Sequence, residues 1–199
     1  MIRIVLFLLL VASPALASDA PLTGGDGHPR DRFPLTLFVA QFGTPSLDLA
    51  AERAIADWNR VAREVLGGDA FTVVATARDA QVFVAALPAR ADAPMGVTQL
   101  ESGSDGVITL PVRIVVHDPQ ARGQTSREVL LYQVLAHELG HALGLPHTTD
   151  PRSLMCCERG AVDLSAPAVR DAYVEARRHP DVGSVKAQLG AHYEKFWRR

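Results

Sequence analysis

The residues best suited to chemistry lie in one stretch, residues 137–147, which reads H-E-x-x-H-x-x-G-x-x-H. An α-helix turns about 100° and rises about 1.5 Å per residue, so His137 and His141 would lie on one helix face, about 6 Å apart along the axis. Two imidazoles at this spacing can bind one Zn²⁺ at Zn–N distances of about 2.0–2.1 Å. Glu138 is placed beside them to hold a metal-bound water. The stretch therefore predicts a zinc site on a helix.

His147 cannot join the other two histidines from a continued helix. It would lie about 15 Å further along the axis than His137 and about 80° away from the ligand face. The helix must therefore end and the chain must fold back. Gly144 is suited to this end because glycine adopts the left-handed conformation most easily. The full pattern would arise by chance in only about 1 in 20,000 chains of this composition, so we treat it as specific.

Length and composition limit the class of protein. The 199 residues are 48% hydrophobic with a formal net charge of −2, which is enough apolar material for one domain with a core. No basic face is apparent, so nucleic acid is not expected as a partner. The two cysteines, Cys156 and Cys157, are adjacent, which excludes a disulfide-rich scaffold. We expect a monomer.

The N-terminus has the pattern of a secretory signal peptide. A positive charge precedes an apolar run over residues 4–11, and Ala-Leu-Ala at 15–17 forms a cleavage site. We expect a signal peptide over residues 1–17 and an exported protein, secreted or periplasmic, with no stable membrane span after cleavage. An uncleaved N-terminal anchor is the alternative. Residues 18–32 are rich in Gly, Pro, Asp and Ala and predict a flexible leader.

The remaining residues, 33–199, are predicted to form one domain. Period-two patterns predict strands at residues 33–42, 71–75, 81–87, 94–101 and 107–117. Helical patterns predict helices at residues 47–66, 165–178 and 182–197, besides the one that carries the zinc stretch. Pro111 inside the last strand indicates an edge position or a bulge. The sequence TSRE at 125–128 has the form of a capping box that opens the zinc helix.

Taken with two later features, the zinc stretch resembles a known superfamily. Ser-Leu-Met follows at residues 153–155, and Thr148 comes directly after the third histidine. In these residues the chain resembles the metzincins, and most closely their matrixin-like branch. The resemblance implies an α+β metzincin (zincin-like) fold, with a twisted, mixed five-stranded sheet and two helices over residues 33–147. A small, mainly helical C-terminal subdomain would follow over residues 148–199.

The resemblance also implies an activity and the residues that perform it. The chain would be a zinc-dependent endopeptidase acting on protein or peptide substrates. The metal ligands would be His137, His141 and His147, and the general base would be Glu138. The Met-turn methionine would be Met155. One wall of the substrate pocket would be formed by Cys156 and Cys157. Glu138 would accept a proton from a zinc-activated water. One catalytic zinc ion is expected, and a further structural ion, for example at His117 and Asp118, is left open.

Several alternatives stay open at this point. Cys156 and Cys157 could be two ordinary thiols or link to another chain, could form a vicinal disulfide, or could supply a thiolate that silences the zinc. The chain could also be a non-catalytic, zinc-containing, protein-binding module of the same fold, or an enzyme that hydrolyses something other than a peptide. The presence of Glu138 argues against the non-catalytic module, since an inactive relative has no chemical need for that carboxylate.

Overall fold

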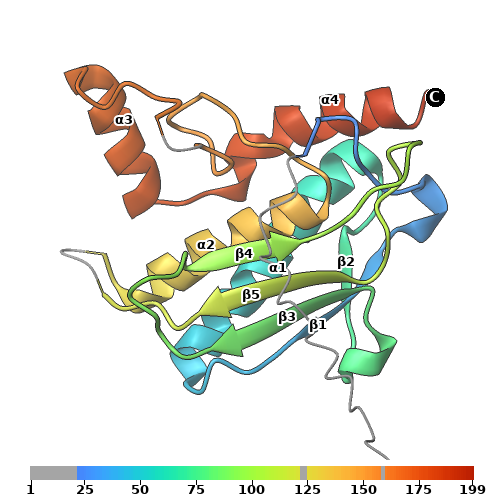
Figure 1. The fold of residues 1–199 in the computed structure, drawn as a ribbon, viewed down its shortest axis with the longest axis horizontal. Helices are drawn as coiled ribbons and strands as arrows, with labels where there is room; N and C mark the ends of the chain where they lie inside the picture. The colour runs from blue at the N-terminus through green and yellow to red at the C-terminus, as the bar shows by residue number, and fades with distance from the viewer. Residues whose placement is uncertain (1–21, 122–124, 158–159) are drawn as a thin grey trace, which may run out of the picture.

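A computed structural model describes residues 22–121, 125–157 and 160–199, so the expected signal peptide at 1–17 lies outside the described residues. The described part is built on a five-stranded sheet with helices packed on it (Figure 1). The strands are β1 (Leu35–Val39), β2 (Phe71–Val73), β3 (Val82–Leu87), β4 (Gly96–Gln99) and β5 (Val112–His117). Their order is β2-β1-β3-β5-β4, with β4 antiparallel to β5 and the other pairs parallel. The predicted α+β fold with a mixed five-stranded sheet is confirmed.

Two long helices, α1 (Pro45–Leu66) and α2 (Arg127–Ala142), pack against each other behind the sheet (Figure 1). The helical spacing of apolar residues on α1 buries its inner side, including Ala54 and Trp58. The Trp58 indole Nε1 donates a hydrogen bond of 2.9 Å to the Ala136 carbonyl oxygen. Because a buried indole N–H must find an acceptor, this bond fixes α1 relative to the part of α2 that carries the zinc stretch.

The C-terminal part of the chain is helical. Its elements are α3 (Pro167–Arg178), the 3₁₀ turn η3 (Val182–Val185) and α4 (Lys186–Phe196). Helix α4 packs against α1, and its buried residues belong to the same apolar core as those of the sheet and of α2. Two further 3₁₀ turns occur, η1 (Arg30–Arg32) and η2 (Ala77–Asp79). Among the helices of the described residues, none combines the length and the apolar character needed to span a bilayer.

Two local predictions were wrong. Pro111 does not mark an edge or a bulge, because β5 begins after it at Val112 and lies between β3 and β4. The hydrogen bonds between β5 and its neighbouring strands therefore do not need the backbone N–H that proline lacks. The cap of α2 is Ser126, whose hydroxyl accepts from the Val129 amide at 3.3 Å, one residue later than the predicted capping box. The carboxylate of Glu128 instead accepts a hydrogen bond from the Ser46 hydroxyl at 3.1 Å.

The predicted flexible leader also differs from the structure wherever it is described, over residues 22–32. Gly27 forms a short ladder, donating its amide to the Gly106 carbonyl and accepting from the Ile108 amide, each at 2.9 Å. The His28 side chain is fully buried. Backbone bonds and buried polar side chains hold this segment, and hydrophobic periodicity detects neither.

Candidate metal centre

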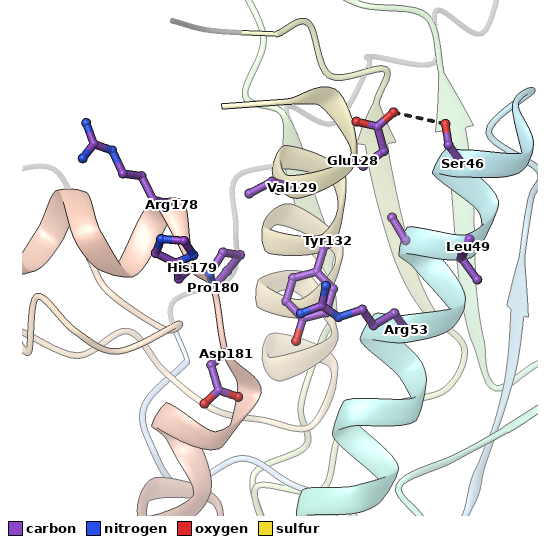
Figure 2. A pocket seen from close by; sticks show the side chains of 11 residues that line it. Ser46, Leu49, Arg53, Glu128, Val129, Tyr132, Arg178, His179, Pro180 and Asp181 are labelled. Atoms are coloured by element: carbon purple, nitrogen blue, oxygen red, sulfur yellow. Dashed lines mark hydrogen bonds between the residues drawn. The ribbon is translucent and has the colours of Figure 1, made fainter. Parts of the chain in front are cut away.

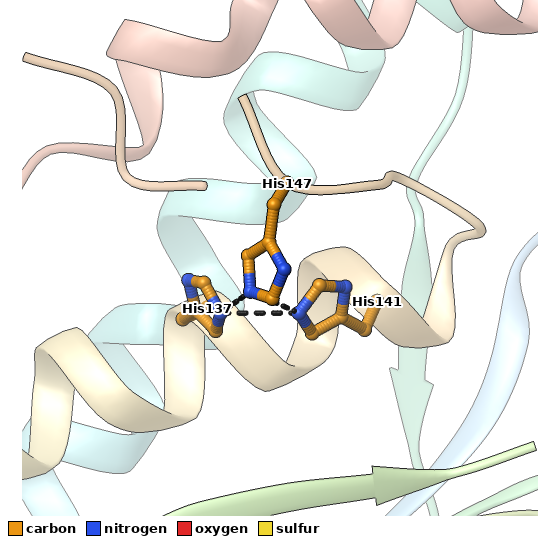
Figure 3. A group of neighbouring side chains, drawn as sticks. All are labelled: His137, His141 and His147. Atoms are coloured by element: carbon orange, nitrogen blue, oxygen red, sulfur yellow. Dashed lines mark hydrogen bonds between the residues drawn. The ribbon is translucent and has the colours of Figure 1, made fainter. Parts of the chain in front are cut away.

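Three imidazoles converge at the C-terminal end of α2 (Figure 3). His137 and His141 lie on one face of the helix, and His147 reaches them from the chain that follows it. Their Nε2 atoms are separated by 3.1 Å between His137 and each of the other two, and by 3.2 Å between His141 and His147. The structure thus brings together the three residues that the sequence pattern predicted as ligands.

A Schellman turn at Gly144 makes this convergence possible. The Gly144 amide donates to the His141 carbonyl at 2.8 Å, and the Leu145 amide donates to the Gly140 carbonyl at 3.0 Å. Gly144 has φ +83°, the left-handed conformation that the sequence predicted for it. The turn reverses the chain and returns His147 to the helix face that it could not reach from a continued helix.

Hydrogen bonds at the far side of each ring fix two of the tautomers. The Nδ1 atoms of His137 and His141 lie 2.8 Å from the carbonyl oxygens of Leu154 and Leu145, respectively. A carbonyl oxygen can only accept, so each Nδ1 carries the hydrogen and each Nε2 presents a lone pair. Two lone pairs 3.1 Å apart repel each other unless a cation lies between them. The donor set therefore fits a metal ion, with the carbonyls as the outer partners that metal-bound histidines usually have.

The dimensions and protonation of the three rings fit zinc. An equilateral triangle with these edges has its centre about 1.8 Å from each nitrogen, less than the Zn–N distance of about 2.0–2.1 Å. The spacing of the three nitrogens is therefore compatible with one zinc ion that contacts all of them. Burial lowers the pKa of His137 to about 3 and that of His141 to about 4, so both rings are neutral at pH 7. Neutral imidazole is the form that binds a metal.

The described residues contain no second group of three or more His, Cys, Asp and Glu side chains with this convergence. At the position considered for a structural ion, Arg127 donates to the Asp118 carboxylate at 2.6 Å. The His117 Nδ1 atom lies 2.9 Å from the Pro94 carbonyl. Both side chains thus have protein partners, and the described residues do not support a second ion there.

Glu138 is 6% exposed and lies against β4. Its Oε2 atom accepts a hydrogen bond of 2.7 Å from the Thr98 hydroxyl. The hydroxyl is also 3.1 Å from the Glu138 backbone oxygen. Sequence reasoning missed Thr98, because nothing near it in the chain indicates that it will lie against a residue forty positions later.

Met155 packs directly against α2. Its side chain is fully buried, and a Cβ atom on Gly140 would lie 2.5 Å from its sulfur. Gly140 stands one residue before His141, so the thioether occupies space that only a glycine leaves open. This packing agrees with the Met-turn role implied by the resemblance, which stays a prediction.

Cys156 and Cys157 are joined by a disulfide, in agreement with the vicinal alternative. Cys156 is buried, and its carbonyl oxygen accepts a hydrogen bond of 2.5 Å from the Arg177 guanidinium. Neither sulfur belongs to the group of converging ligand atoms, so the thiolate alternative has no support. The pocket wall expected at this pair continues into residues 158–159, which lie outside the described residues, and it stays a prediction.

Residues distant in sequence hold the turn that leads to His147. The Ala142 carbonyl accepts from His28 Nε2, the Leu143 carbonyl from the Tyr193 hydroxyl, and the Pro146 carbonyl from Gln188 Nε2, each at 2.9 Å. The first two bonds satisfy carbonyls at the end of α2, and the third satisfies a carbonyl in the loop that follows the helix. Sequence reasoning identified none of these three donors.

The chain also has a cavity of about 560 Å³ on another face of α2, between α1 and the chain after α3 (Figure 2). Tyr132, which lines it, precedes His137 by five residues and therefore points about 140° away from it around the helix. The Arg53 guanidinium lies 4.6 Å above the Tyr132 ring, and the Tyr132 hydroxyl donates to Asp57 at 2.7 Å. None of the predicted site residues lines this cavity.

Comparison with known proteins agrees with this site. Residues 91–162 match the sequence model of the family described as matrixin. Macrophage metalloelastase from Oryctolagus cuniculus is 51% identical over 35 residues, which is 18% of this chain and 8% of the relative. The chain thus matches only a small part of that relative's length. The predicted matrixin-like resemblance is confirmed, and the matched segment includes the zinc stretch.

Proposed function

We propose that this matrixin-like chain is a zinc-dependent endopeptidase that hydrolyses peptide bonds in protein or peptide substrates. The observation that carries the proposal is the convergence of three imidazole nitrogens within 3.2 Å of one another, on a helix that also carries the buried Glu138. We further propose that the protein acts as a monomer. It would be secreted or periplasmic after removal of residues 1–17.

In this proposal His137, His141 and His147 hold one zinc ion through Nε2. When bound, zinc lowers the pKa of a coordinated water and polarises the carbonyl of the substrate. Glu138 accepts a proton from the water that attacks the peptide carbonyl, and then donates it to the leaving nitrogen. Met155 supports α2 beneath the ligands and takes no part in proton transfer.

The substrate is proposed to bind along β4. This strand lies at the edge of the sheet, and its neighbour within the sheet is β5. An extended peptide can pair with such an edge through backbone hydrogen bonds, while pockets select among its side chains. Since β4 also contacts Glu138 through Thr98, a peptide bound there would lie close to the proposed base. We assign Cys156 and Cys157 to one wall of the side-chain pocket.

The proposal is tested with zinc-loaded protein and a library of proteome-derived peptides, with and without a chelator. Glu138→Gln should lower kcat by at least about a hundredfold, the lower end of what a general base contributes, with zinc content unchanged. Glu128→Gln is the matched control, because it makes the same change at the start of the same helix, where the carboxylate contacts Ser46. It should retain activity.

The outcomes separate the three classes of function. Full activity of the Glu138→Gln variant would contradict the role of the base. Stoichiometric zinc with no cleavage of any peptide would favour the non-catalytic, protein-binding module. Chelator-sensitive hydrolysis of esters or other amides, but not of peptides, would favour the hydrolase with a different substrate.

A further inference from the structure

Two residues of β4 face the Glu138 side chain. Alternate residues of a strand point to the same side of the sheet, so Gly96 and Thr98 both face α2. Thr98 is 3% exposed, and its hydroxyl lies 2.7 Å from Glu138 Oε2. The contact is thus buried at both ends and links an edge strand to the proposed base.

The hydroxyl of Thr98 has one hydrogen and two acceptors within reach. Glu138 Oε2 is the nearer, at 2.7 Å against 3.1 Å for the Glu138 backbone oxygen. A distance of 2.7 Å is ideal for a hydroxyl donor and 3.1 Å is long, so the hydrogen points to Oε2. The terminal torsion of a glutamate is otherwise broad. This bond therefore selects one rotation of the carboxylate.

Gly96 leaves room for the other side of the same carboxylate. A Cβ atom at this position would lie 2.6 Å from Glu138 Oε1 and 2.6 Å from Val134 Cγ1. Real side chains do not approach this closely, so any residue larger than glycine would displace Glu138 or shift β4 away from α2. The two positions on β4 thus define where both carboxylate oxygens lie.

We infer that Thr98 is a positioning residue, which orients the Glu138 carboxylate for proton transfer and does not itself touch the reacting atoms. The inference rests on the proposed role of Glu138 as general base. It also links substrate binding to the base, because the strand proposed to pair with the peptide is the strand that holds the carboxylate. A shift in the register of β4 would therefore disturb both together.

The test compares Thr98→Val with Thr98→Ser, since valine keeps the shape and removes the hydroxyl while serine keeps the hydroxyl. Thr98→Val should lower kcat by about tenfold or more, as expected for loss of a hydrogen bond to a charged group, with KM within about twofold. Thr98→Ser should stay within about threefold of the wild type. Thr98→Ala replaces the valine variant if the latter does not fold.

Thr36→Val is the matched control. Thr36 lies on β1 of the same sheet, separated from β4 by two strands, and its hydroxyl donates to the Asp79 carbonyl at 2.9 Å. This control should change stability and leave kcat unchanged. Equal kcat for Thr98→Val and wild type would overturn the inference. So would a parallel loss of kcat, zinc content and folding in Thr98→Val and Thr98→Ser, since that pattern indicates a structural role.

A binding measurement separates this inference from the proposed function. Acetohydroxamic acid binds zinc through its oxygens and offers an acidic proton to a neighbouring carboxylate, so its affinity reports the orientation of Glu138 without catalysis. Its Kd, measured calorimetrically with zinc-loaded protein, should rise about tenfold in Thr98→Val and stay unchanged in Thr98→Ser and Thr36→Val. If the wild type cleaves no peptide, the proposed function fails. In that case a tenfold higher Kd of Thr98→Val would still support the positioning role of Thr98. Equal Kd values for Thr98→Val and the wild type would overturn that role.

Discussion

Replacing Gly144 by alanine should destabilise the protein through two separate effects. Gly144 has φ +83°, and a residue with a side chain in the left-handed region loses about 1–2 kcal/mol relative to its normal conformation. The added Cβ atom would also lie 2.1 Å from the Asp26 backbone oxygen. Relieving such an overlap requires a backbone shift, which costs about 1–3 kcal/mol in a packed region. The two effects together amount to about 2–5 kcal/mol.

Gly67 provides a control that isolates the first effect. It ends α1 with φ +84°, almost the same backbone conformation, and a Cβ atom there would meet nothing within 4 Å. Gly67→Ala should therefore lose only the conformational part, about 1–2 kcal/mol. The difference between the two variants measures the contact between the turn and the N-terminal segment.

Urea unfolding of the zinc-free protein gives the free energy of unfolding for each variant, and competition with a chelator gives zinc affinity. Gly144→Ala should weaken zinc binding as well, because the turn at Gly144 places His147, whereas Gly67→Ala should leave it unchanged. Equal destabilisation by the two substitutions, with zinc affinity intact in both, would refute the close packing of residues 22–28 on this turn.

Two further predictions concern pH and redox state. Burial lowers the pKa of His28 to about 4, below its usual 6.5, and no described group pairs with its Nδ1 atom. The stability that neutral His28 provides is complete above pH 6.5 and is lost as pH falls towards 4, by up to about 3 kcal/mol. His28→Gln should flatten this part of the pH dependence of urea unfolding in zinc-free protein, and an unchanged slope would contradict the assignment. For Cys156 and Cys157, intact mass should increase by two hydrogens on reduction of the denatured protein; an unchanged mass would exclude the disulfide.

The elements of the fold could be predicted from periodicity, but their ends could not. The strand predicted at residues 107–117 begins only at Val112 in the sheet. Its first residues pair elsewhere, Val107 with Gly27 and Ile108 with Ser102. An apolar run shows that a segment is buried, and it does not show which neighbour it pairs with. Pairing partners depend on the tertiary arrangement.

The convergence of His137, His141 and His147 was predictable because helix geometry and one glycine determine their relation over eleven consecutive residues. Thr98 and Gly96 were not, because they reach Glu138 only through the packing of β4 on α2, forty residues apart in the chain. The register of β4 decides this contact, since a shift by one residue would turn the other face of the strand towards the helix. Local spacing therefore indicates which residues can bind a metal, and the packing of the sheet determines which residues contact the Glu138 carboxylate beside them.

The same distinction applies to the position of His147. Local sequence predicts that the chain turns at Gly144, yet three carbonyls around that turn accept hydrogen bonds from His28, Gln188 and Tyr193. These three donors come from the two opposite ends of the described chain. His28 and Tyr193 are 50 or more residues away from the carbonyls to which they donate. A buried carbonyl without a partner is unfavourable by about 1–3 kcal/mol, so loss of either end would loosen the turn even with the histidines intact. The position of His147 is thus a property of the whole fold, although its identity as a ligand can be predicted from eleven residues.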